Sequence, residues 1–322
     1  MTVPREKISK KAVQIDRSLR RGMFFESARA GFKAFLKEAL GAKAGKVLLP
    51  SYIGWSPKEG SGVFDPVEES GVDAVFYKVS DRLRIDLQDV EKCLNNNDID
   101  VAVIIHYFGY VDPGYREFTD LARKAGALVF EDEAHSMFSD LIGGICGRLG
   151  DAGVYSLHKL LPLDKGGILF LNNRRSLEGF EGAPVPELTH WDYDLFEISR
   201  RRRENCLELS NQLKSLAGEV DLLWPSLGDG VIPQTLPVLI QRVSRDRLYE
   251  EMNARGYGVV SLYHTLIRPI GSGSFPVSYG LSRRIMNLPV HQDLTVKELG
   301  GLVDGLRDCV RKLGGKDMFR AQ

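Results

Sequence analysis

The first half of the sequence alternates short apolar runs with amphipathic segments, and this alternation constrains the fold more than any other feature. Most of the runs are apolar at nearly every position, which is typical of strands buried on both faces of a parallel sheet. The segments between them carry apolar residues at helical spacing. We therefore predict an α/β fold with a largely parallel sheet between two layers of helices. The predicted strands are residues 46–50, 73–79, 100–106, 127–131, 152–157 and 167–171, and the predicted helices are residues 27–40, 86–94 and 113–126.

The character of the chain changes after about residue 180, where long charged segments replace the alternation. We predict a large domain over residues 1–190, of which residues 1–21 form an arm, and a smaller C-terminal α/β domain over residues 191–322. Arg200–Arg203 form the one dense basic run, and Glu197 and Glu204 flank it. We interpret the run as a charged helix face. The elements predicted here are helices over residues 194–216, 246–255 and 296–313 and a strand over residues 235–241.

Composition and charge exclude several classes of protein. The chain has 43 basic and 43 acidic residues, so it has no general attraction for nucleic acid or anionic lipid. No stretch approaches the ~18 apolar residues that span a bilayer, and residues 1–14 lack the apolar core of a secretory signal. The four cysteines form no C-x-x-C pair, which argues against a disulfide or zinc framework. We expect a cytoplasmic protein without nucleic-acid or membrane partners.

Three polar clusters follow predicted strands, at the edge of a parallel sheet where ligands bind: His106–Gly109, Asp132–His135 and Ser156–Lys159. A carboxylate such as Asp132 needs a cationic or hydrogen-bonding partner there, or else it caps a helix. A lone lysine at a strand end is usually solvated. Beside an anionic cofactor, however, desolvation lowers the pKa of a lysine and leaves a nucleophilic amine, which makes Lys159 a candidate nucleophile.

The ordered set of motifs resembles the fold type I pyridoxal-phosphate enzymes, and within them the DegT/DnrJ/EryC1/StrS aminotransferases, which act on sugars. The resemblance spans about residues 22–313 and implies a seven-stranded, mostly parallel sheet in the large domain. The matching segments are Ser27-Ala28-Arg29, Pro50-Ser51-Tyr52, His106-x-Phe108-Gly109, Glu131-Asp132-x-Ala134-His135, Gly150-Asp151, Ser156, Lys159, Gly166-Gly167, Leu262-Tyr263-His264 and Leu288-Pro289-Val290-His291.

The resemblance implies three catalytic residues and pyridoxal 5'-phosphate as cofactor. Lys159 matches the lysine that holds the cofactor as a Schiff base and then serves as general acid and base. Asp132 is similar to the aspartate that keeps the ring nitrogen protonated, so that the ring works as an electron sink. His135 stands where the family has Gln or His, near the phenolic oxygen of the ring.

Further cofactor contacts follow from the same resemblance. Ser27, Ala28 and Arg29 open a helix, whose backbone N–H groups and dipole are expected to bind the phosphate, and Ser156 resembles a second phosphate ligand. An aromatic ring stacks on the cofactor in the family. Trp55 and Tyr52 both lie near the right place, and we prefer Trp55, although either ring also fits a packed core.

The chain departs from the family pattern beside the site. Ser156 and Lys159 are closer together than is usual, and Asp164-Lys165 precedes the glycine pair where the family has Glu. The family's Gly-x-Asn-x-Arg type loop, which reaches the partner subunit's substrate and phosphate, is missing from residues 181–200, where Thr189–Asp194 stand. The cofactor is therefore better supported than the sugar substrate.

The resemblance implies an aminotransferase that moves an amino group from glutamate to a nucleotide-linked keto-sugar in ping-pong fashion, as a homodimer with shared sites. Other chemistries of the same cofactor stay open. Ser156-x-His158-Lys159 also resembles cysteine desulfurases, for which Cys146 is the only cysteine in a glycine-rich loop. Some relatives with histidine in place of the lysine are dehydratases, and Lys159 argues against that chemistry. The altered loop also allows a non-catalytic binding or regulatory subunit.

Overall fold

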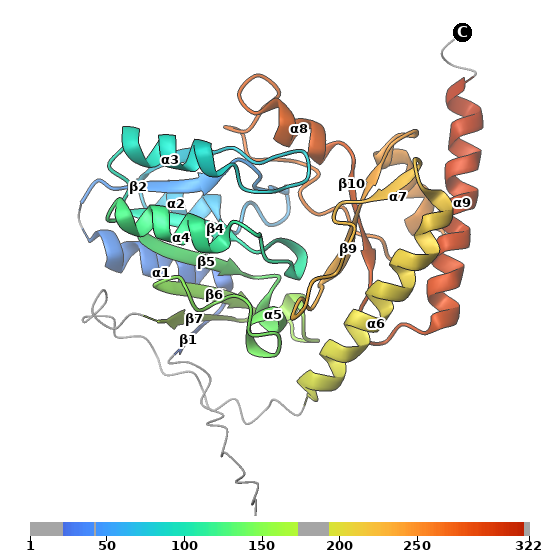
Figure 1. Cartoon of the computed structure of the whole chain (residues 1–322), viewed down its shortest axis with the longest axis horizontal. Coiled ribbons are helices and arrows are strands. Elements are labelled where there is room, and N and C mark those ends of the chain that lie inside the picture. Colours follow the sequence, from blue (N-terminus) through green and yellow to red (C-terminus); the bar gives the residue numbers. More distant parts are fainter. Residues whose placement is uncertain (1–21, 42, 173–192, 319–322) are drawn as a thin grey trace, which may run out of the picture.

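The computed structural model describes residues 22–41, 43–172 and 193–318, and within them two β-sheets, each with its own helices (Figure 1). The larger sheet has seven strands in the order β1-β7-β6-β5-β4-β2-β3. Neighbouring strands from β3 to β6 are parallel, whereas β7 is antiparallel to both β6 and β1. The strands are β1 (Gly22–Phe25), β2 (Lys46–Pro50), β3 (Asp73–Tyr77), β4 (Val101–Ile105), β5 (Leu128–Glu133), β6 (Ala152–Ser156) and β7 (Gly167–Leu171).

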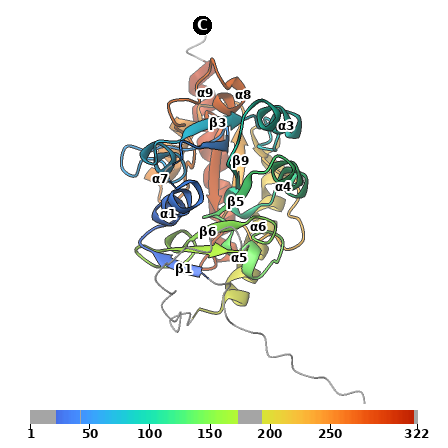
Figure 2. The same cartoon turned by 90° about the vertical axis from the view of Figure 1, so that its left-hand side faces the viewer.

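Helices cover both faces of this sheet (Figure 2). Helices α1 (Ala28–Leu40) and α2 (Phe64–Glu69) pack together on one face, and α3 (Leu87–Asn96) and α4 (Tyr115–Lys124) pack together on the other. The short helix α5 (Met137–Leu141) and the 3-10 turns η1 (Tyr107–Gly109) and η2 (Leu157–Lys159) lie beyond the carboxyl ends of β5, β4 and β6. Every residue of β4 and β6 is buried, as their continuous apolar character predicts.

Helix α1 shows how the local sequence sets an element next to the site. The Ser27 side chain accepts a hydrogen bond from the Ala30 N–H, which caps the helix, and Phe32, Phe35 and Leu36 bury its inner face. Gly41 ends the helix at φ 58°, a conformation that glycine adopts without strain. The predicted helix over residues 27–40 and its cap are therefore confirmed.

The smaller sheet is antiparallel, with strands in the order β10-β9-β8. Its core is made by buried side chains of this sheet and of the two long helices α6 and α9, which pack against each other. The elements are α6 (Leu195–Leu213), η3 (Lys214–Leu216), β8 (Val220–Leu222), β9 (Thr235–Ile240), α7 (Arg245–Ala254), α8 (Pro276–Ser282), β10 (Ile285–Pro289) and α9 (Val296–Met318).

The predicted α/β architecture is confirmed, with a seven-stranded, mostly parallel sheet and a second α/β unit. Six short α-helices and β-strands were not predicted: β1, α2, α5, β8, α8 and β10. The strand predicted over residues 127–131 continues to Glu133, so Asp132 belongs to β5 itself. The predicted arm and the boundary at residues 190 and 191 lie outside the described residues. None of the helices in the described ranges is long and apolar enough to cross a bilayer.

The basic run Arg200–Arg203 requires a correction. Arg200 is exposed and pairs with Glu197 and Glu204, as a charged helix face predicts. Arg202, in contrast, is only 4% exposed and donates to the carbonyl of Gln234 at 3.1 Å and to that of Leu160 at 3.5 Å. The interpretation as a solvated face is wrong for Arg202, because its long side chain carries the guanidinium from α6 into a buried junction with the segment that follows η2.

Candidate active site

The polar clusters after β4, β5 and β6 meet at one edge of the large sheet. The His106 N–H donates to the Asp132 carbonyl at 3.1 Å, which joins the ends of β4 and β5. Lys159, which ends η2 after β6, places its Nζ 3.1 Å from Nε2 of His135. Three segments separated in sequence therefore converge where parallel strands end, the usual place for a ligand in such a fold.

The hydrogen bonds of His135 define its protonation. The Phe108 backbone N–H donates to His135 Nδ1 at 3.3 Å, so Nδ1 carries no proton. Burial holds the pKa of His135 well below its ordinary value, so the ring is neutral. Its proton then lies on Nε2, which faces the Lys159 amine. Since Nε2–H can only donate, this contact requires an amine with a free electron pair.

The electrostatics of Lys159 favour the same uncharged amine. Lys159 as a whole is exposed, whereas its amine lies against buried His135. Desolvation of the amine lowers the pKa of Lys159, and the opposing charges of Asp132 and Glu59 offset only part of this effect. A lowered pKa leaves more of the amine uncharged, and the uncharged form is the nucleophile for a carbonyl compound.

Asp132 is a buried carboxylate with an unused acceptor. Its Oδ1 accepts from the Ala134 N–H at 2.9 Å, and no group of the described residues donates to Oδ2. Burial raises the pKa of Asp132, and the nearby Lys159 and the bond from Ala134 oppose the rise. The alternative role as a helix cap does not hold, because the next helix begins at Met137 with Ser136 before it.

The start of α1 lies against the start of β7. In a variant with alanine at position 167, the added Cβ would stand 2.6 Å from the Ser27 carbonyl oxygen and closer still to Ala28 N. Gly167 also pairs with Ser156 across β6 and β7. Ser156, Ser27 and Ala28 are thus brought to one place. The backbone N–H groups of Ala28 and Arg29 have no acceptor among the described residues, which leaves them to bind an anion.

The Arg29 side chain has protein partners of its own. Its guanidinium donates to the Glu59 carbonyl and forms an ion pair with Asp65 at 3.2 Å. Ser156 is 2% exposed, and its hydroxyl lies 3.4 Å from His158 Nδ1. We therefore assign any anion contact of Arg29 to its backbone N–H, because the side chain already has two acidic or carbonyl partners.

The structure separates the two aromatic candidates. Tyr52 is fully buried and stacks on Tyr263, with ring centroids 5.4 Å apart, and Tyr263 meets the His135 ring edge-on at 5.9 Å. Trp55 is 42% exposed, and its backbone N–H bonds to the Thr265 carbonyl. Tyr52, and not Trp55, therefore belongs to the aromatic group at His135. Tyr263 was given no role from sequence, although it lies in one of the matching segments.

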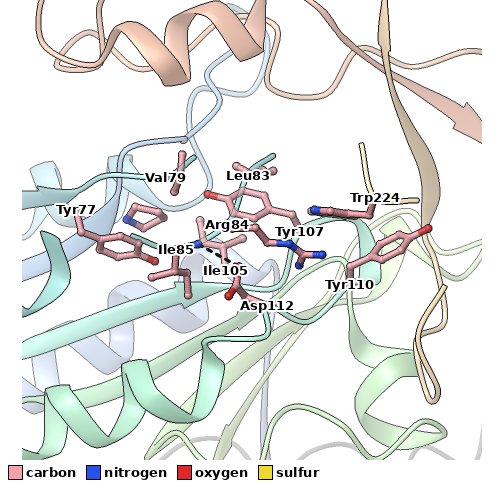
Figure 3. Close-up of a pocket in the computed structure, with 11 residues that line it drawn as sticks. Tyr77, Val79, Leu83, Arg84, Ile85, Ile105, Tyr107, Tyr110, Asp112 and Trp224 are labelled. Atoms are coloured by element: carbon pink, nitrogen blue, oxygen red, sulfur yellow. Dashed lines mark hydrogen bonds between the residues drawn. The ribbon is translucent and has the colours of Figure 1, made fainter. Parts of the chain in front are cut away.

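A small cavity lies beside this aromatic group, between the ends of β2, β3 and β4 (Figure 3). It encloses about 10 Å³, and the Arg84 guanidinium lies 4.9 Å from the Trp224 ring centroid at its wall. Asp112 accepts a bond from the Ile85 N–H at 3.1 Å there. That volume suits about one water molecule, so the cavity is too small to be the substrate site.

Comparison with known proteins gives a family match over the segments that carry this site. The model of the DegT/DnrJ/EryC1/StrS aminotransferase family matches residues 27–180, which include every site residue discussed above except Tyr263. The chain is 24% identical over 289 residues to dTDP-4-dehydro-2,3,6-trideoxy-D-glucose 4-aminotransferase of Saccharopolyspora spinosa, covering 76% of this chain and 74% of that protein. It is 25% identical over 156 residues to UDP-4-amino-4,6-dideoxy-N-acetyl-beta-L-altrosamine transaminase of Campylobacter jejuni, covering 46% of this chain and 42% of that protein.

Solved structures support the fold. The crystal structure of DesI in the presence of its TDP-sugar product superposes with a TM-score of 0.76 at 20% identity, over 94% of this chain and 84% of that one. The predicted enzyme class, a pyridoxal-phosphate-dependent aminotransferase, is that of the matched family, and both relatives are named as aminotransferases or transaminases. Over residues 27–180, a little under half of its length, the chain is similar to the DegT/DnrJ/EryC1/StrS aminotransferase family.

Proposed function

We propose that the protein transfers an amino group from an amino acid, glutamate, to a nucleotide-linked keto-sugar, with pyridoxal phosphate bound covalently to Lys159. The observation that carries this proposal is the position of the Lys159 amine, 3.1 Å from neutral His135 and within electrostatic range of buried Asp132. An uncharged amine, a carboxylate and an anion site at one sheet edge match the three functional parts of that cofactor.

The residues present fit the cofactor. Asp132 Oδ2 has no donor among the described residues and is free to accept from a pyridinium N–H. The N–H groups of Ala28 and Arg29, together with the Ser156 hydroxyl, offer donors for a phosphate. Desolvation lowers the pKa of the Lys159 amine, which favours the uncharged form that reacts with an aldehyde. When bound, pyridoxal phosphate supplies an electron sink for the substrate's Cα–H bond.

Each of the three central side chains then has one task. Asp132 would hold a proton on the ring nitrogen through Oδ2, the oxygen to which no described residue donates. His135, fixed by the Phe108 N–H, keeps its Nε2 proton directed at the site as a hydrogen-bond donor. Lys159 Nζ accepts and returns the proton during transfer, and such general acid–base groups contribute roughly 10²–10⁴-fold to rate.

The substrate class rests on the relatives. Both curated relatives are named for nucleotide-linked sugars, one dTDP-linked and the other UDP-linked. The glutamate donor and a homodimer with shared sites follow from the resemblance to the family. The two-domain division near residue 190 is proposed on the same basis, together with the separate cores of the two sheets.

Two other chemistries of this cofactor are less consistent with the structure. A desulfurase needs a reactive thiolate, but Cys146 is 1% exposed, and burial together with nearby carboxylates raises the pKa of its thiol well above the ordinary value. A dehydratase needs histidine at the lysine position. Lys159, and not the adjacent His158, contacts His135, so a shift of the motif by one residue is not supported.

The two half-reactions provide the test. Protein loaded with pyridoxal phosphate should lose its lysine-bound absorbance band on addition of glutamate and regain it with a nucleotide-linked 4-keto-sugar. Lys159→Ala should show neither change, whereas Lys165→Ala, which removes an exposed lysine nearby, should behave as wild type. If glutamate and a panel of other amino donors leave the wild-type band unchanged, the transfer reaction is rejected. If Lys159→Ala responds like wild type, the lysine assignment is rejected.

A further inference from the structure

A second cluster of reactive side chains lies behind Asp132, on the opposite face of β5. Side chains alternate along a strand, so Glu131 and Glu133 point away from the face that presents Asp132. Both glutamates are fully buried, and so are the nearby His106 and Asp140. The three buried carboxylates lose their hydration, which costs free energy. Bound protons or nearby cations are needed to offset that cost.

His106 is arranged as a metal-binding histidine. Its Nε2 lies 2.9 Å from Glu131 Oε2, and Glu131 also accepts from the N–H groups of Gly147 and Gly150. Burial raises the pKa of Glu131, but the bonds from His106 and others outweigh it, so this carboxyl is ionised. It therefore draws the imidazole proton to Nε2. Nδ1 of His106 is buried and has no hydrogen-bond partner among the described residues, which leaves its lone pair available.

Glu133 and Cys146 complete the cluster. The potential ligand atoms of His106, Glu133 and Cys146 all lie within 4.8 Å of one another, and the three residues are at most 1% exposed. Cys146 Sγ is 3.6 Å from Glu133 Oε2. Gly147, at φ 70°, leaves room beside them, since a Cβ there would stand 2.5 Å from Glu133 Oε1 and nearer still to Asp140 Oδ2. The carboxylates of Glu133 and Asp140 thus both lie next to the space that Gly147 leaves without a side chain.

We propose that His106, Glu133 and Cys146 bind a zinc ion. An imidazole, a carboxylate and a thiolate are the three ligand types that zinc takes in proteins, and the softness of the thiolate favours zinc over magnesium or calcium. The bond from His106 to Glu131 repeats the carboxylate–histidine–metal arrangement that orients such ligands. The ion would neutralise the buried carboxylates and tie Cys146, in the loop before β6, to the strand that presents Asp132.

Binding changes the protonation of Cys146. Burial raises the pKa of the thiol, and the charges of Glu133, Asp140 and Glu131 raise it further, so the free protein carries S–H. The zinc–sulfur bond replaces that S–H bond, and the proton passes to the solvent. The widely spaced ligands explain why the cysteine pattern of the sequence did not indicate a metal.

Cobalt(II) provides the test, because a cobalt–thiolate bond gives a charge-transfer band in the near ultraviolet. Tag-free, metal-free full-length protein is titrated with Co²⁺ and then with Zn²⁺. We expect one equivalent of Co²⁺ to give the band and Zn²⁺ to abolish it. Cys146→Ser should lack the band, and Glu133→Gln should bind roughly tenfold or more weakly. The matched control is Cys206→Ser, which removes another buried thiol, bonded to Tyr110, and should titrate as wild type.

The outcome does not depend on cofactor or substrate, so it is independent of the proposed aminotransferase activity. A wild-type protein with no band and no stoichiometric metal would overturn the proposal. The cluster would then be held by hydrogen bonds between protonated side chains, without a metal. A band that persists in Cys146→Ser, or that Cys206→Ser abolishes, would overturn the ligand assignment. Circular dichroism of the variants checks that each is folded before titration.

Discussion

Gly167→Ala tests the contact that brings β7 to the start of α1. The new Cβ would stand 2.6 Å from the Ser27 carbonyl oxygen, where an ordinary contact needs about 3.5 Å, so the two backbones must separate by about 1 Å. A flexible side chain cannot relieve the clash, because the three atoms nearest to the Cβ are backbone atoms of Ser27 and Ala28. Strand pairing holds Gly167 on both sides, through Ser156 and Phe25, so the helix start must move.

Two effects follow from that displacement. Overpacking of this kind lowers the free energy of unfolding by roughly 1–3 kcal/mol. A shift of about 1 Å at a binding group can also cost about 10²-fold in rate, so binding of the cofactor phosphate and turnover should both weaken. Denaturant unfolding followed by circular dichroism measures the first effect, and titration of the cofactor-free protein with pyridoxal phosphate measures the second.

Gly301→Ala is the matched control. Gly301 lies in α9, where an added Cβ meets nothing within 4 Å, and alanine is favoured over glycine in a helix by about 1 kcal/mol. This variant should be as stable as wild type or more stable, with unchanged cofactor affinity. If Gly167→Ala matches Gly301→Ala in both stability and cofactor affinity, the close approach of β7 to α1 is not as described, and the phosphate site built on it is refuted.

The remaining predictions concern charge and pH. Asp132→Asn removes the charge that raises the pKa of Lys159, so amine labelling of the cofactor-free protein should begin at lower pH, and an unchanged labelling profile would contradict the coupling. Burial depresses the pKa of His135, so the unfolded chain binds more protons below about pH 6.5, and stability should fall on acidification by up to about 1.4 kcal/mol per pH unit. The His135→Gln variant should lose this part of the pH dependence of its free energy of unfolding, which urea unfolding at several pH values measures. Arg202→Ala leaves buried carbonyls without a donor and should lower the free energy of unfolding by roughly 1–3 kcal/mol, whereas Arg200→Ala should change it little.

Much of the large sheet was predictable because its strands are buried on both faces and their apolar character is continuous. β2 agrees with the predicted residues 46–50, and β7 agrees with the predicted residues 167–171. The short strand β1 was missed because only four residues form it, and its pairing with β7 is a tertiary contact with no local signal.

The site was predictable to the extent that it follows strand ends. Asp132 and Lys159 could be placed together because parallel strands bring their carboxyl ends to one edge. The protonation of His135 could not be predicted, since it depends on a backbone N–H from another loop. Neither could the burial of Arg202 or the contact of Tyr263 with His135, because both depend on how the smaller sheet's elements pack on the large one.

The central claim is that Lys159 is the lysine that holds pyridoxal phosphate. The most direct measurement is reduction of the loaded protein with borohydride, followed by proteolysis and mass spectrometry of the modified peptide. One reduced phosphopyridoxyl group per chain on Lys159, absent from Lys159→Ala, is the predicted result. A stoichiometric adduct on another lysine, or no adduct in a wild-type protein saturated with the cofactor, would contradict the account.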